Sequence, residues 1–178
     1  SVAQTFEAAF GRIDLEIEVQ SYCRQYADRT TPLHAHLAEL PFSVYVNTAP
    51  DPALANALRA AGREPSTAYY DFRRGRPFDL PAPTPQRPWV FDLYGSLAEP
   101  QSLVLTERDL LDYLVNVVKG APPLPPALIS RFRDPSATLL FVCFGFRRWH
   151  QRILLHVLRA YDPPSSPSLA LEDSAFYS

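Results

Sequence analysis

The chain has 178 residues, a net charge of −2, 47% hydrophobic residues and 20% charged residues, which are ordinary values for one soluble globular domain. This charge balance offers no basic surface for nucleic acid or an anionic membrane. No stretch has the form of a signal peptide, and none approaches the roughly 20 apolar residues of a membrane span.

Two features of the composition concern the origin of the chain. It contains 19 prolines and no methionine, so we expect a domain of a longer protein, in contact with further domains or with a protein partner. The two cysteines, Cys23 and Cys143, have neither zinc-site nor redox-motif spacing. We expect Cys143, which lies in an apolar run, to be a buried free thiol and the protein to be cytoplasmic.

The first part of the chain is predicted to be helical. Apolar residues at helical spacing predict helices over residues 1–32, with a break at Gly11. A short helix over 33–40 should follow and end at Pro41, because proline cannot continue it. The β-branched and aromatic run 42–46 then predicts a strand.

The next segment alternates between helix and strand. Asp51 as the N-cap and Pro52 at the first helical position predict a helix that ends at Gly62. A second strand is expected over 67–71. This alternation favours an α/β fold, a Rossmann-like and mostly parallel sheet flanked by helices.

Residues 73–88 open with a run that contains Arg73, Arg74 and Arg76, continue with several prolines, and predict an irregular loop. We interpret the arginines as solvated, with capture of a phosphate or an acidic partner as the alternative. Strands are expected at 89–93 and, as an extended segment, at 103–105.

The C-terminal part opens with a helix-start signal. Thr106 and Asp109 form a capping box, and the following helix should end at Gly120. We expect its apolar face to contain Leu110, Leu114, Val117 and Val118.

A short helix is expected over 127–133, and the apolar run 137–144 predicts a central strand buried on both faces. The last helix should cover 147–160, and residues 163–178 should form a Pro/Ser-rich tail or linker. Residues 1–162 would then be a single domain. We expect the apolar stripe of the last helix to contain Trp149, Ile153, Val157 and Tyr161.

The order of these segments resembles a known family. The segment from Tyr94-Gly95-Ser96 to Thr-Glu-Arg-Asp109 is the most specific part, and an Asp51 that opens a leucine-rich helix and an Arg-x-Trp-x-x-Arg motif around Trp149 add to it. Over roughly residues 33–160 the chain resembles the prokaryotic SIR2-like domain, a sirtuin-related Rossmann domain often found in bacterial NAD-depleting anti-phage defence proteins.

The resemblance implies a site and a chemistry. Such a domain would bind NAD through a glycine-rich loop and cleave the nicotinamide–ribose bond with an asparagine and a histidine. Carried over to this sequence, Thr48, Asp51, Gly95 and Ser96 are weak candidates for cofactor contacts.

The sequence departs from the family pattern at each catalytic position. The family's asparagine, histidine, serine and aspartate fall on Ala49, Tyr94, Gly145 and Arg148, and the six glycines stand singly. The resemblance therefore implies a catalytically degenerate domain without a cofactor, which acts as a scaffold, a sensor or a protein-interaction module. An active NAD⁺ glycohydrolase with a rearranged site, built from Asn47 and Tyr94, is the alternative.

Other candidate residues do not suggest a separate activity. The four histidines lack the i, i+4 spacing of a helical metal pair, so no metal site is expected. Four arginines surround the last helix. We interpret them as a solvated face, with contact to an acidic partner or a nucleotide phosphate as the alternative; they are Arg147, Arg148, Arg152 and Arg159.

Overall fold

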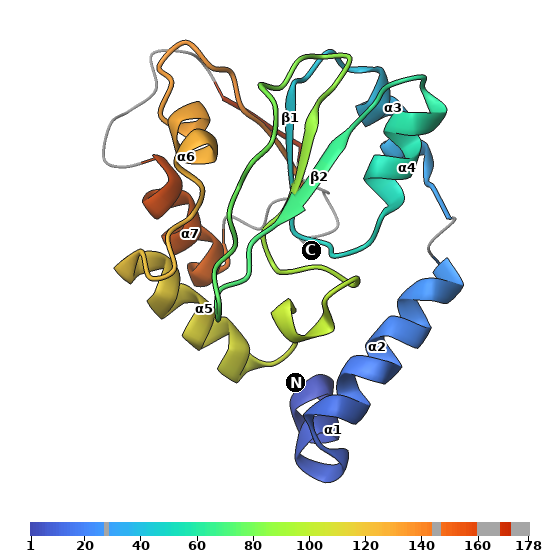
Figure 1. Ribbon diagram of the computed structural model, residues 1–178, viewed down its shortest axis with the longest axis vertical. Coiled ribbons are helices and arrows are strands. Elements are labelled where there is room, and N and C mark those ends of the chain that lie inside the picture. The colour runs from blue at the N-terminus through green and yellow to red at the C-terminus, as the bar shows by residue number, and fades with distance from the viewer. Residues whose placement is uncertain (27–28, 144–146, 160–167, 172–178) are drawn as a thin grey trace. The chain divides into compact units, whose positions relative to one another are not determined.

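The computed structural model describes residues 1–26, 29–143, 147–159 and 168–171 (Figure 1). The helices are α1 (Val2–Phe10), α2 (Arg12–Tyr26), α3 (Pro32–Glu39), α4 (Ala53–Ala60), α5 (Glu107–Lys119), α6 (Pro126–Phe132) and α7 (Trp149–Arg159), with one turn of 3₁₀ helix, η1, at Pro100–Ser102. The strands are β1 (Val44–Asn47), β2 (Ser66–Tyr69), β3 (Trp89–Asp92), β4 (Leu140–Val142) and β5 (Leu169–Leu171). The chain divides into two compact units, Ser1–Tyr113 and Leu114–Ser178.

The first unit is built on a three-stranded parallel sheet with the strand order β1-β3-β2. The central strand is β3, in which Trp89, Val90 and Phe91 are all buried. Strands that are buried on both faces read as continuous apolar runs, which explains why this short segment lies in the middle. The α/β, mostly parallel Rossmann-like fold that the sequence predicted is confirmed.

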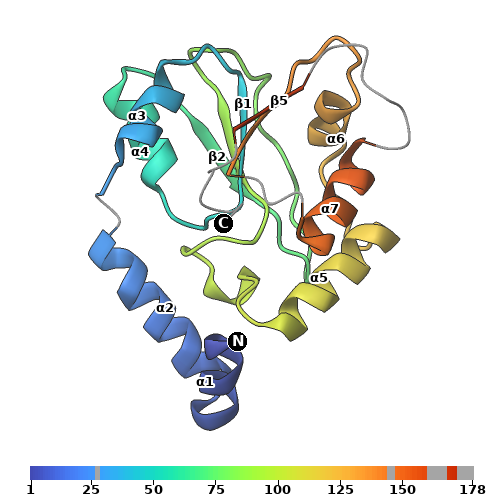
Figure 2. The same ribbon diagram turned by 180° about the vertical axis from the view of Figure 1, so that it is seen from behind.

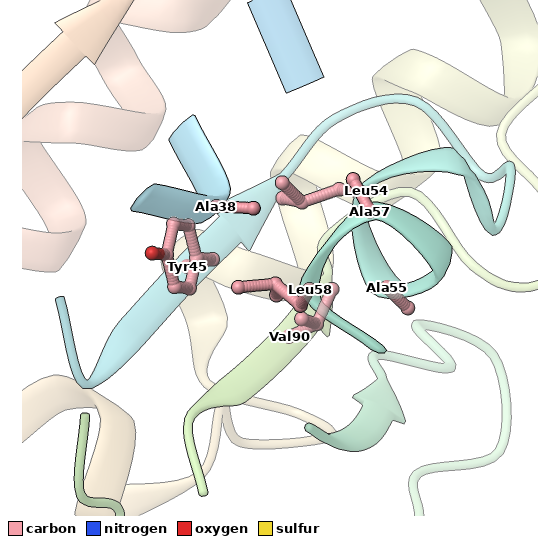
Figure 3. Close-up of a cluster of buried hydrophobic side chains, with 7 residues drawn as sticks. All are labelled: Ala38, Tyr45, Leu54, Ala55, Ala57, Leu58 and Val90. Atoms are coloured by element: carbon pink, nitrogen blue, oxygen red, sulfur yellow. The ribbon is translucent and has the colours of Figure 1, made fainter. Parts of the chain in front are cut away.

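One face of this sheet is covered by α3 and α4. The two helices pack against each other, and Figure 3 shows their apolar side chains meeting those of the sheet. Leu58 is fully buried at the centre of this cluster. The cluster consists of Ala38, Tyr45, Leu54, Ala55, Ala57, Leu58 and Val90.

The start of α4 differs slightly from the prediction. Pro52 is the N-cap, and the Asp51 carboxylate accepts a hydrogen bond from the Ala53 N–H at 2.9 Å. Asp51 therefore stabilises the helix start as predicted, but from the position before the N-cap. Its side chain accepts the backbone N–H two residues further along the chain, as in an Asx-turn. Gly62 follows the helix with a φ of +76°, which confirms it as the C′ residue.

The other face of the sheet is covered by the irregular segment 73–88. Phe78 packs edge-on against Trp89 and Phe91, with ring centroids 4.9 and 5.7 Å apart. The Trp89 indole N–H donates to the Pro81 carbonyl oxygen at 2.8 Å. The segment is irregular, as predicted, but Phe78 and Pro81 contact the buried strand β3.

The first three arginines of this segment are exposed, and two of them also bond to the protein. Arg73 donates to Asp109 and to the Gln101 carbonyl oxygen, and Arg76 donates to the Tyr69 hydroxyl. The interpretation of three solvated arginines agrees with their exposure, but for Arg73 and Arg76 the protein itself also supplies acceptors.

The start of α5 confirms the capping box. The Thr106 N–H donates to Asp109 Oδ2 at 3.0 Å, and the Asp109 N–H donates to Thr106 Oγ1 at 3.1 Å. Leu103 has extended dihedral angles but belongs to no sheet. On α5, Leu114 and Val117 are buried and Leu110 is half-buried, as predicted, whereas Val118 is exposed and Tyr113 is also buried.

The second unit contains a two-stranded parallel sheet of β4 and β5. The run 137–144 was predicted as a central strand, but β4 has three half-buried residues and pairs with β5 alone among the described residues. Its strand partner, Leu169–Leu171, comes from the segment predicted as a tail. The prediction was wrong because apolar content does not specify which strands pair.

The buried face of α7 is displaced by one residue from the prediction. Leu154 and Leu158 are buried, whereas Trp149 and Ile153 are 50% and 36% exposed. Tyr161 lies outside the described residues. Both sets have i, i+4 spacing, so periodicity alone could not choose between them. Cys143 is exposed, contrary to the prediction of a buried thiol.

Candidate functional site

The carboxyl ends of the three parallel strands meet at one edge of the sheet, where open α/β sheets bind their ligands. The strands end in register, with Asn47 opposite Asp92 and Tyr69 also opposite Asp92. Side chains in register on neighbouring parallel strands point to the same face. The structure therefore places the candidate Asn47 beside Asp92, a residue that the sequence did not single out.

The side chain of Asn47 is engaged in hydrogen bonds. Its Nδ2 donates to Asp92 Oδ1 at 3.2 Å and to the Ala49 carbonyl oxygen, and its Oδ1 accepts from the Ala49 N–H at 3.0 Å. Both amide hydrogens and one oxygen lone pair thus hold the turn after β1 and the end of β3. Asn47 has a structural role that competes with binding a substrate.

Asp92 is the most perturbed carboxyl of this edge. Burial raises its pKa to about 7, and the negative charge of Asp51 adds to the increase, although the hydrogen bond from Asn47 opposes it. A carboxyl with this pKa exchanges its proton near neutral pH. The signal that could have found it is an acidic residue directly after the buried run Trp89–Phe91.

Asp51 occupies the N-terminal end of α4. A helix N-terminus is where an open α/β fold receives a phosphate group, but the Asp51 carboxylate already accepts the Ala53 N–H. Asp92 places a second carboxyl close by. Two carboxyl groups therefore lie near the start of α4, where they would repel a phosphate group when both are ionised. Thr48, the neighbouring candidate, is exposed.

Tyr94 belongs to an aromatic cluster. Its ring packs edge-on against Tyr113 of α5 at 5.2 Å, and Tyr70 and Phe72 pack against the same ring at 5.8 Å. Tyr113 is fully buried, and burial raises its pKa well above the ordinary value. Packing thus accounts for the aromatic ring at Tyr94.

Gly95 and Ser96 shape the loop after β3. Gly95 has a φ of +90°, and a Cβ atom there would lie 2.3 Å from the Ser102 carbonyl oxygen. The Ser96 N–H donates to Ser102 Oγ at 2.9 Å, and Ser96 Oγ accepts from the Ala98 N–H at 3.2 Å. The close approach requires glycine, so both cofactor candidates have a structural reason to be there.

The remaining candidates are more peripheral. Gly145 lies outside the described residues, and Arg147, Arg148 and Arg152 are exposed. Arg159 donates to Ser168 Oγ at 3.3 Å. Within the described ranges, no group of three or more His, Cys, Asp or Glu side chains could hold a metal ion, and no helix there is long and apolar enough to cross a membrane.

These features define an α/β domain of the open parallel-sheet class, with polar side chains at the carboxyl edge of the sheet. A family model described as the SIR2-like domain matches residues 43–174. The chain belongs to this family. No curated protein matches the sequence. Because the match begins at residue 43, helices α1 to α3 precede the family domain.

Proposed function

We propose that this chain is a catalytically degenerate SIR2-like domain that acts as a sensor, scaffold or protein-interaction module of a larger protein. The observation that carries the proposal is the use of Asn47. Its amide holds the turn at Ala49 and the end of β3, while Ala49 stands where the family has its catalytic asparagine.

Two further observations support the proposal. Asp51 fills the N-terminal end of α4, and Asp92 adds a second carboxyl near it, which disfavours the phosphates of NAD. Tyr94 packs into an aromatic cluster, which gives its ring a packing role at this position. On this proposal the chain keeps the fold of the family but lacks the side chains that the family's reaction needs.

Incubation of the purified chain with NAD tests the proposal directly. We expect no release of nicotinamide above the rate of a buffer blank, measured by chromatography over several hours. Turnover that is lost in Asn47→Ala or Asp92→Asn would overturn the proposal. A thermal-shift titration with NAD and ADP-ribose separately detects binding without turnover.

The alternative function is NAD hydrolysis by a rearranged site. It is favoured by one observation, the hydrogen-bonded pair of Asn47 and Asp92, because the pKa of Asp92 near 7 suits a general base. In that case the rate of nicotinamide release should rise with pH around 7. It should disappear in Asp92→Asn, and Tyr94→Phe would show whether the tyrosine hydroxyl takes part.

The biological setting of the proposal is a prokaryotic anti-phage defence protein with a cytoplasmic protein partner or additional domains. Its support is the family alone, and a fold does not fix a function. Loss of phage resistance on disruption of the parent gene in its host would support this setting, and unchanged resistance would contradict it.

A further inference from the structure

Helix α2 contacts the rest of its unit through a polar stripe. Arg12, Glu16, Gln20 and Cys23 follow one another at helical i, i+4 and i+3 spacing and are all partly buried. Such spacing puts them on one face of the helix. The face that a helix turns toward its domain is usually apolar, so this arrangement needs an explanation.

The polar stripe is held by specific acceptors. Arg12 donates to Asp109 Oδ2 at 2.5 Å and to the Leu103 carbonyl oxygen at 3.0 Å, and it pairs with Glu16 on its own helix at 2.7 Å. Gln20 donates to the Leu97 carbonyl oxygen at 2.7 Å. Leu97 and Leu103 lie in the segment between β3 and α5, and Asp109 lies in the first turn of α5.

These contacts place α2 against the segment that follows the carboxyl end of β3. Leu97 belongs to the loop that follows β3, the strand that ends at Asp92. Burial raises the pKa of the Cys23 thiol, and the charge of Asp51, in the loop that follows β1, adds to it. Helix α2 therefore lies near the loops after β1 and β3, at the end of the sheet toward which the β2 arrow points (Figures 1 and 2).

The attachment of α2 depends on little apolar burial. Leu15 is its only buried residue among fifteen, and α1 has none. Hydrogen bonds contribute only a modest net free energy, so α2 can separate at a lower free-energy cost than global unfolding.

We propose that α1 and α2 form a detachable cover that closes the carboxyl edge of the sheet, held by Arg12 and Gln20. The cover is an autoinhibitory contact, because ligands of open parallel sheets approach this edge. It precedes the part of the chain that matches the family domain. The inference goes beyond the proposed function, since it concerns access to Asn47 and Asp92 whether or not NAD is turned over.

Arg12→Ala is the variant that should open the cover. Asp109 keeps Arg73 and the backbone N–H groups of Leu105 and Thr106 as partners when Arg12 is removed, so no buried carboxylate is left alone. The matched control is Arg87→Ala, which removes an exposed arginine that pairs with Glu64 at 3.6 Å.

The reactivity of Cys23 reports the opening. In a Cys143→Ser background Cys23 is the one thiol of the chain, and its rate of reaction with a soluble aromatic disulfide is followed by absorbance. Loss of about 1–2 kcal/mol of attachment predicts a rate roughly 5–30-fold higher for Arg12→Ala. The rate of Arg87→Ala should stay unchanged.

Gln20→Ala is a second, milder variant in case Arg12→Ala does not fold, since it removes one neutral hydrogen bond. It should raise the rate by a smaller factor, while urea unfolding midpoints of both variants stay close to that of the parent. Equal rates in Gln20→Ala and Arg87→Ala, or acceleration that only follows global unfolding, would overturn the proposal. Neither outcome depends on whether NAD is hydrolysed.

Discussion

Helices α4 and α2 belong to the same unit but are attached in opposite ways. Helix α4 buries five of its eight residues, whereas α2 buries one of its fifteen and uses hydrogen bonds to carbonyl and carboxylate oxygens. Apolar burial is strong and non-directional, while hydrogen bonds require particular partners and contribute less net free energy. Helix α4 is thus part of the folded core, and α2 is an attachment.

Leu58→Ala tests the apolar side of this comparison and should have the largest effect. Leu58 is fully buried between α4 and the sheet, so the substitution leaves a cavity and should lower the free energy of unfolding by about 2–5 kcal/mol. Urea unfolding measures the loss. Leu111→Ala, at a residue that is 54% exposed, is the control and should change stability by less than about 0.5 kcal/mol.

Gly95→Ala acts on the loop that supplies the acceptors of α2. A Cβ atom would lie 2.3 Å from the Ser102 carbonyl oxygen at a φ of +90°. We therefore expect the free energy of unfolding to fall by about 1–3 kcal/mol, measured by thermal unfolding. Gly62→Ala is the matched control, because it has a φ of +76° and nothing within 4 Å of the added atom. An equal loss in both variants would show that the close contact is unimportant.

Asp92→Asn tests the carboxyl edge of the three-stranded sheet. The pKa of Asp92 is about 7 in the folded protein and near 3.9 in an unfolded chain, so the folded state holds the proton more tightly. The free energy of unfolding should therefore fall as pH rises from about 4 to 7. Above pH 7 the variant should be more stable than the parent.

Urea unfolding of both proteins at pH 5 and pH 8 measures this difference. Subtracting the free energy of unfolding of the variant from that of the parent removes the contribution of the histidines, which both proteins share. The carboxyl of Asp109 does not interfere. Burial alone would raise its pKa, but hydrogen bonds from Arg12, Leu105 and Thr106 lower it, so its contribution is lost only at more acidic pH. Identical pH dependence in the two proteins would contradict the prediction.

Leu15→Ala is the counterpart of Leu58→Ala on α2 and should have the smallest effect on global unfolding, below about 1 kcal/mol. The lost burial weakens the attachment of a helix that separates before the core unfolds. Hydrogen exchange should therefore increase in residues 12–26 and remain unchanged in residues 44–58. A urea midpoint lowered as much as in Leu58→Ala would place α2 in the core.

The sequence predicted well the features that depend on neighbouring residues. The break at Gly11, the capping box of Thr106 and Asp109, and the end of α4 at Gly62 are local, because a few consecutive residues fix the backbone there. The family domain was also predicted from local motifs and is confirmed. The sequence singled out Asn47 but not its neighbour Asp92, since Asp92 belongs to a strand distant in sequence.

The tertiary structure decided what depends on pairing between distant segments. It placed β3 at the centre of the sheet, paired β4 with β5, and turned the polar stripe of α2 toward its unit. The hydrophobic content of a segment predicts that it is buried, but it does not specify which other segment packs against it. The sequence by itself determined the local elements and the family, whereas strand order and the surroundings of Asp92 arose from long-range packing.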